Sequence, residues 1–154
     1  MDESSKPTYI RQESHGANSP NIAGNHNTVF SGPVQVNIDR RISPSAAGII
    51  VRGLTDQPCA VTVGVLGMGG EPEQLANQIL LAVSEDGRPA VGVNHGLGFH
   101  PFYGVQLRHS TINPPLRAVE AIAKAFASDG LSYVTIPDSG QPAGSIYIYV
   151  GFRP

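Results

Sequence analysis

The chain has 154 residues, a length that suits one domain with an appendage, and its formal net charge of −2 argues against general nucleic-acid binding. Charged residues make up only 14% of it, against roughly 25% in typical globular chains, and a surface so poor in charge favours self-association. The single cysteine excludes an intrachain disulfide, the first residues are polar, and no apolar run is long enough to span a membrane, so we predict a soluble cytoplasmic protein.

Residues 1–17 are polar and aperiodic, and they predict an arm that is disordered on its own. Residues 18–42 place branched apolar side chains between Asn, Ser and Gly, and Val34–Ile38 alternates strictly, as half-buried strands do. Because stacked Asn side chains can form ladders along a repeat axis, the pattern favours one rung of a β-solenoid. One rung cannot bury its own apolar side chains, so we predict a homo-oligomer, with a trimer or a larger assembly both open. The residues expected to join the copies are Asn21, Ile22, Asn27, Val29, Val34, Val36 and Ile38.

Residues 43–59 read as a connection between two regions. Ser43–Gly48 is rich in Ser, Pro and Gly and indicates a linker, Ile49–Val51 indicates a short apolar strand, and Asp56–Pro58 indicates a turn. A separate domain is therefore expected to begin at residue 60.

Residues 60–154 alternate strand and helix patterns. Apolar runs and alternation predict strands, and two stripes at helical spacing, each opened by Pro and closed by Gly, predict helices. The order is that of a two-layer α/β sandwich with four or five strands and two helices. Right-handed crossovers leave a split βαβ arrangement or a small Rossmann-like sheet, and the tight spacing of the middle strands favours the first. The expected strands are 61–66, 91–93, 103–108, 133–136 and 146–150, and the expected helices begin near residues 71 and 114.

Two parts of the chain carry a resemblance. The segment Asn18-Ser19-Pro20-Asn21-Ile22-x-Gly24-x-x-Asn27-x-Val29 resembles a motif of many uncharacterised bacterial proteins, where it precedes a variable C-terminal module. The ending Gly144-Ser145-Ile146-Tyr147-Ile148-Tyr149-Val150-Gly151-Phe152-Arg153-Pro154 is similar to that of a small bacterial α/β domain of unknown function. The resemblance brings no known activity, so it implies no catalytic residues.

The turn Gly67-x-Gly69-Gly70 lies between an expected strand and an expected helix, which is the setting of a phosphate-binding turn. A dinucleotide fingerprint would need a third glycine where Pro72 stands, and Glu71 and Glu73 would repel a phosphate. An ordinary glycine turn is therefore favoured over a nucleotide site.

The loop from His95 to Tyr103 is the best candidate for ligand binding, because it lies at the end of the sheet where ligands often bind in α/β folds. Its side chains of interest are His95, Phe99, His100 and Tyr103. Since a metal site needs three or four ligands, we expect no metal here. The alternative is a surface loop that its aromatic residues anchor.

The last expected strand places Tyr147 and Tyr149 on one face. Such residues either form an interface or face a helix, and the sequence leaves both open. No Gly-x-Ser-x-Gly elbow is present and Cys59 has no histidine near it in sequence, so we expect no catalytic residues and no cofactor. The leading hypothesis is a self-assembling scaffold or interaction protein, which could also contact another protein. A ligand-sensing module is the second hypothesis and an enzyme the third.

Overall fold

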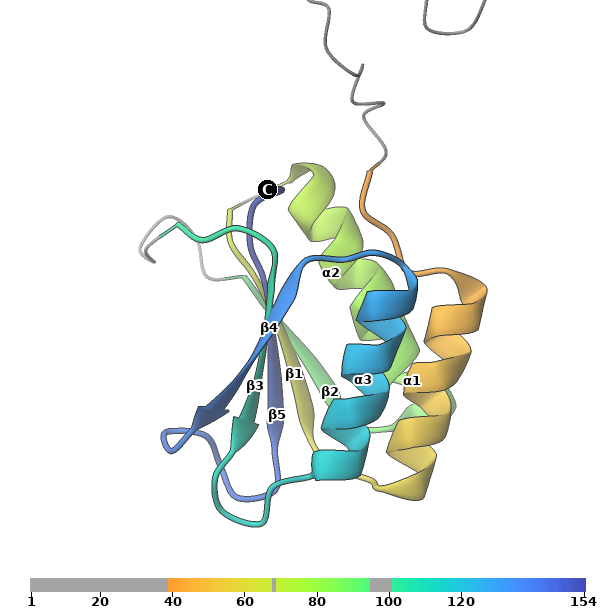
Figure 1. Ribbon diagram of the computed structural model, residues 1–154, viewed down its shortest axis with the longest axis vertical. Helices are drawn as coiled ribbons and strands as arrows, with labels where there is room; N and C mark the ends of the chain where they lie inside the picture. Colours follow the sequence, from red (N-terminus) through yellow and green to blue (C-terminus); the bar gives the residue numbers. More distant parts are fainter. Residues whose placement is uncertain (1–38, 68, 95–100) are drawn as a thin grey trace, which may run out of the picture. The chain divides into compact units, whose positions relative to one another are not determined.

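The computed structural model describes residues 39–154 apart from 68 and 95–100. In this part of the chain, three α-helices lie on one side of a five-stranded sheet, which gives a two-layer α/β architecture (Figure 1). None of the described helices is long and apolar enough to cross a membrane. The elements are, in chain order, α1 (Pro44–Asp56), β1 (Val61–Val65), α2 (Gly70–Val83), the 3₁₀ turn η1 (Glu85–Gly87), β2 (Ala90–Asn94), β3 (Val105–Ser110), α3 (Leu116–Ser128), β4 (Tyr133–Asp138) and β5 (Ile146–Val150).

The first helix corrects the sequence analysis, which predicted a linker and a short strand over residues 43–59. Ser43 caps α1, because its hydroxyl oxygen accepts a bond from the Ala46 N–H at 3.2 Å, and proline follows at the first helical position. The Ser-Pro pair therefore starts a helix here, where the prediction took it for a loop. The buried residues Ala46, Ile50 and Leu54 recur every four positions, which is the spacing that was overlooked.

The sheet has the order β2-β1-β5-β3-β4. β1 and β2 are parallel neighbours joined through α2, β3 and β4 are parallel neighbours joined through α3, and β5 lies between these βαβ units. β5 runs parallel to β1 and antiparallel to β3. Both predicted topologies are therefore wrong: the neighbouring strands of each unit are not split, and a Rossmann-like sheet would not carry an antiparallel pair at its centre.

The core lies between the sheet and the helices. Helix-facing residues of the three inner strands form the centre of this core: Val63 on β1, Leu107 on β3 and Ile148 on β5 are at most 2% exposed. The buried apolar cluster extends from Ala46 to Val150, so residues 39–154 contain a complete hydrophobic core. The helices also pack on each other: a Cβ atom added at Gly53 of α1 would lie 2.2 Å from the Cβ of Ala121 on α3.

Candidate functional site

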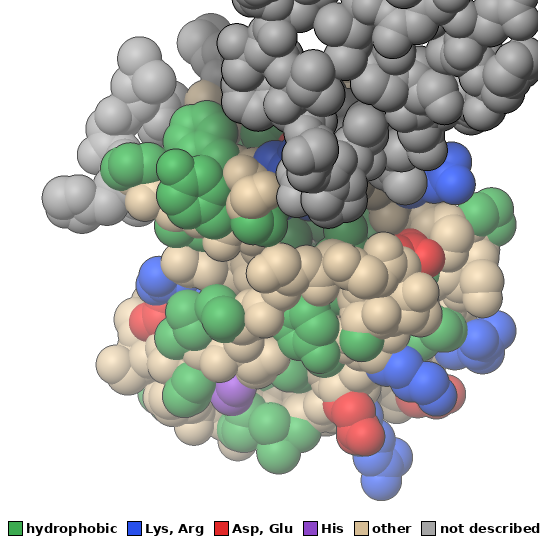
Figure 2. Space-filling model, turned by 45° about the horizontal axis from the view of Figure 1, so that its top comes forward, with side chains coloured by type: hydrophobic (Ala, Val, Ile, Leu, Met, Phe, Trp, Pro, Cys, Tyr) green, Lys and Arg blue, Asp and Glu red, His purple; other side chains and the backbone are tan. Residues whose placement is uncertain are grey.

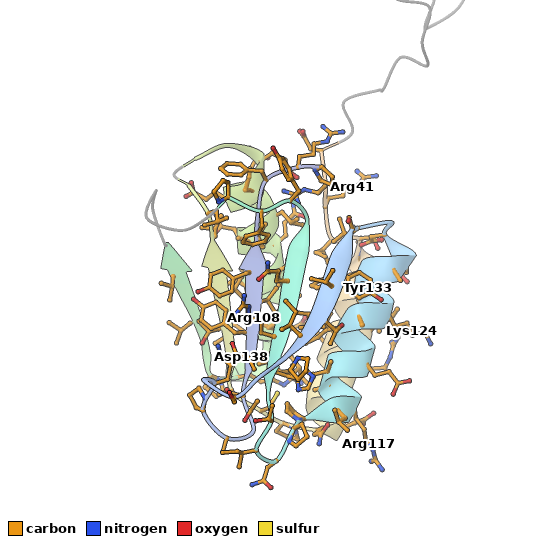
Figure 3. The ribbon with its side chains drawn as sticks, turned by 60° about the vertical axis from the view of Figure 1, so that its left-hand side comes forward. Arg41, Arg108, Arg117, Lys124, Tyr133 and Asp138 are labelled. Atoms are coloured by element: carbon orange, nitrogen blue, oxygen red, sulfur yellow. The ribbon has the colours of Figure 1, made fainter. Side chains whose placement is uncertain are left out.

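The second face of the sheet is covered by no helix in the described part of the chain (Figures 1 and 3). The strand registers place one set of alternating residues on this side, which we call the open face. Its residues are Thr62 and Gly64 of β1, Val91 and Val93 of β2, Gln106 and Arg108 of β3, Val134 and Ile136 of β4, and Tyr147 and Tyr149 of β5.

Aromatic side chains occupy the centre of the open face. The rings of Tyr147 and Tyr149 stack with centroids 4.3 Å apart and planes 20° apart, and Phe102 meets Tyr149 edge-on at 6.3 Å. Burial, followed by the neighbouring Tyr149, raises the pKa of the Tyr147 hydroxyl above its ordinary value. The two tyrosines thus point away from the helices, which excludes the helix-facing alternative. Such preformed aromatic surfaces are typical of the centres of protein interfaces.

Arg108 is the cation of the open face, and its charge is balanced within the same face. Its guanidinium carbon lies 5.6 Å from the Tyr149 ring centroid, and its Nη1 atom contacts Asp138 Oδ2 at 3.2 Å (Figure 3). Its Nε and Nη2 atoms donate to Gln106 Oε1 at 3.1 and 2.9 Å. Bonds from the Gly140 backbone and the Gln141 amide, and then from Arg108, lower the pKa of Asp138. The face therefore presents no excess positive charge that would favour a phosphate backbone.

Apolar side chains flank this centre on both edge strands. Val91 of β2 is 57% exposed and Val134 of β4 is 54% exposed. In Figure 2 most of the visible acidic and basic side chains lie on the right, over the helices, whereas the sheet side on the left carries few. The open face is thus the weakly charged side of the domain, with an aromatic centre and apolar flanks.

The predicted glycine turn is present, but the chain's own carboxylates occupy it. Gly67 and Gly69 have φ values of 87° and 78°, which favour glycine. The Gly69 N–H donates to the carboxylate of Glu73, so the donor at the start of α2 is already used. Glu71 in the same turn is held by Arg40. These carboxylates occupy the place that a phosphate would take, and the turn is best explained as a structural one.

Arg40 connects the start of the domain to the sheet, and sequence reasoning missed it. Its Nε and Nη2 atoms donate to the two carboxylate oxygens of Glu71, both at 2.7 Å, and Nη2 also donates to the Gly151 carbonyl at 2.7 Å. The side chain is only 8% exposed, and its buried Nη1 has no hydrogen-bond partner among the residues that the structure describes. These contacts fix Arg40 against the first turn of α2 and the residue that follows β5. No local pattern indicates them, because the partners lie 31 and 111 residues further along the chain.

A hollow of about 280 Å³ lies between α2 and the strands β1 and β2. It exists beside Gly92, where β2 has no side chain on the side that faces Leu80. Six of its eight lining residues are Val, Ala, Leu or Gly, and Glu73 and Asn77 add a carboxylate and an amide. The lining residues are Val63, Val65, Glu73, Ala76, Asn77, Leu80, Gly92 and Val93.

Of the four loop residues predicted for ligand binding, the structure describes Tyr103, which is 71% exposed and forms an isolated parallel bridge with Phe152. The Phe152 ring lies 3.9 Å from the place of a Cβ atom on Gly67, so Tyr103 and the glycine turn share one end of the sheet. Other predicted residues lie outside the described part of the chain. These are His95, Phe99 and His100 of the loop and Asn21, Ile22, Asn27, Val29, Val34, Val36 and Ile38 of the N-terminal segment.

The described residues contain no group of three or more His, Cys, Asp and Glu that could hold a metal ion. Burial raises the pKa of the Cys59 thiol to about 11, so this thiol is protonated at neutral pH and is a weak nucleophile. Comparison with known proteins found no matching family model, no matching curated protein and no matching solved structure. The function is therefore argued from the surface of the domain.

Proposed function

We propose that this chain is a self-assembling interaction protein. Its N-terminal segment, up to Ile38, joins copies of the chain, and each α/β domain displays its open face to a partner protein. The observation that carries the proposal is that the described helices cover one face of the sheet and leave the other with a stacked tyrosine pair between exposed valines. Tyrosine and arginine at the centre of a weakly charged surface are the residues that dominate protein interfaces.

The size of the open face supports display in several copies. Five strands about 4.8 Å apart, with five residues of about 3.3 Å each, give a face of roughly 400 Å². A stable complex buries about 800 Å² on each partner, so one domain alone would bind weakly. Copies joined by their N-terminal segments would bind a repeated partner with avidity. Self-assembly through the N-terminal segment would thus strengthen partner binding by the open face.

The oligomeric state of the full chain tests self-assembly. Multi-angle light scattering of residues 1–154 should give a multiple of the 16.2 kDa chain mass, whereas residues 39–154 should give the mass of one copy. The shorter chain retains Arg40, Ser43 and the complete core, so circular dichroism should show it folded. A monomeric full chain would contradict the proposal. A fragment that assembles as fully as the whole chain would contradict the role of the N-terminal segment.

A further inference from the structure

The two edges of the sheet differ in how they are protected. β4 contains Pro137, which has no backbone donor, and Asp138, which is charged. β2 reads Ala-Val-Gly-Val-Asn, with no charge and no proline, and no described residue pairs with its outer side. Natural edge strands usually carry charges, prolines or a cover that prevents pairing. β2 lacks the charges and the proline, and among the described residues its outer backbone has no strand partner.

The hollow next to β2 adds a place for side chains. Because Gly92 has no side chain, Leu80 of α2 packs over it and borders the hollow together with Val93. Val63 and Val65 form its floor and are only 2% and 7% exposed. A strand laid along the outer side of β2 would direct every second side chain toward this hollow. Its volume of about 280 Å³ suits small branched side chains.

A strand of the required kind is present in the sequence. Val34-Gln35-Val36-Asn37-Ile38 alternates branched apolar and neutral polar side chains. The apolar side of such a strand suits Leu80 and Val93 beside Gly92, and its backbone can complete the hydrogen bonds of the β2 edge. This is the β-strand addition by which many sheets bind extended segments.

We propose that residues 34–38 of one copy add to the outer edge of β2 in a second copy. The inference rests on the proposed self-assembly and names the surface that receives the segment. Arg40, two residues after the segment, contacts Glu71 of α2 with its backbone N–H and the Gly151 carbonyl with its side chain. We assign the segment to the edge of another copy because the proposed self-assembly requires a contact between copies. Such a head-to-tail contact builds a ring or an open filament.

Two matched variants of the full chain test the edge. Val91→Lys places a charge on β2, and Val134→Lys places the same charge at a position of similar exposure on β4. Light scattering should show that the first variant loses the assembled mass and that the second keeps it, with both folded by circular dichroism. Equal behaviour of the two variants in an oligomeric chain would overturn the inference while leaving self-assembly in place.

Cross-linking then identifies the occupant. In a Cys59→Ala background, an untagged Gln35→Cys copy is mixed with a tagged Val91→Cys copy and treated with a short bismaleimide. An adduct between the two copies is expected, and a Val134→Cys copy should give none. An oligomer that gives no adduct would overturn the inference. A chain that carries both Gln35→Cys and Val91→Cys serves as a second sample, and cross-linking that occurs only within this chain, never between copies, would also overturn it. A monomeric chain would overturn the proposed function as well.

Discussion

The two βαβ units of the sheet share a topology but differ in what they leave at the surface. In the second unit, β3-α3-β4, the helix packs closely on α1 through Ala121, and the edge strand carries Pro137 and Asp138. In the first unit, β1-α2-β2, a hollow remains beside Gly92, Leu81 on the helix is 72% exposed, and the edge strand has no charge. The comparison teaches that topology alone does not locate a binding surface, since side chains make one unit closed and the other open.

The largest effect is expected where the second unit is packed most tightly. Gly53→Ala places a Cβ atom 2.2 Å from that of Ala121, so α1 and α3 must separate and the core beneath them must loosen. We expect urea denaturation to show a loss of about 3 kcal/mol in the free energy of unfolding.

Gly48→Ala is the matched control in the same helix, because the nearest atom to its new Cβ would be Arg52 Nη1 at 3.7 Å. Alanine has the higher helix propensity, so this variant should gain about 0.5–1 kcal/mol. If both alanine variants changed the free energy of unfolding equally, the close contact between Gly53 and Ala121 would not be important for the packing of α1 on α3.

A smaller effect is expected at the ion pair of the first unit. Arg40→Leu leaves the Glu71 carboxylate, in a side chain only 16% exposed, and the Gly151 carbonyl without their donor. The expected cost is about 2 kcal/mol in thermal or urea unfolding.

The pair of the second unit provides the comparison, because the side chain of Arg108 is 35% exposed. Arg108→Leu should change stability by less than about 1 kcal/mol. A larger loss at Arg108 than at Arg40 would reverse this ranking of the two units.

The smallest effect concerns acid stability at Asp138. Its pKa is lower in the folded chain than in the unfolded one, so its contribution is present above the unfolded pKa of about 4 and is lost as the pH falls through the folded pKa. Asp138→Asn should therefore be less stable than the parent at pH 6, and the difference should shrink toward pH 2 in urea titrations. A difference that stayed constant over this range would show that the carboxylate charge contributes nothing.

Local patterns in the sequence predicted much of the fold. The alternation of residues 146–150, the second helix and the α/β two-layer class were confirmed. Val119, Ile122 and Phe126 of α3 are buried, whereas Leu116 at its start is 58% exposed. The place of β5 between β1 and β3 was not predictable from such patterns, because it is fixed by contacts between distant parts of the chain. The helix α1 was missed because its Ser-Pro start and internal glycines resemble a loop.

Less of the candidate site was predictable from the sequence, because it too depends on contacts between distant parts of the chain. Alternation placed Tyr147 and Tyr149 together, yet only the arrangement of the helices decides that they point away from the core. The ion pair that neutralises Arg108 joins it to Asp138, 30 residues later, so no pattern of neighbouring residues predicts it. The same holds for the hollow beside Gly92, which α2 and two strands form together.

The position of Arg40 has a mechanical consequence for an assembled chain. Any pull on the N-terminal segment reaches the domain at this residue, whose guanidinium is bonded to Glu71 at the start of α2 and to Gly151 at the end of β5. β5 is the middle strand and has hydrogen-bonded neighbours on both sides. Part of such a pull therefore passes through the guanidinium to a strand that two rows of hydrogen bonds hold, and the rest passes along the backbone into α1.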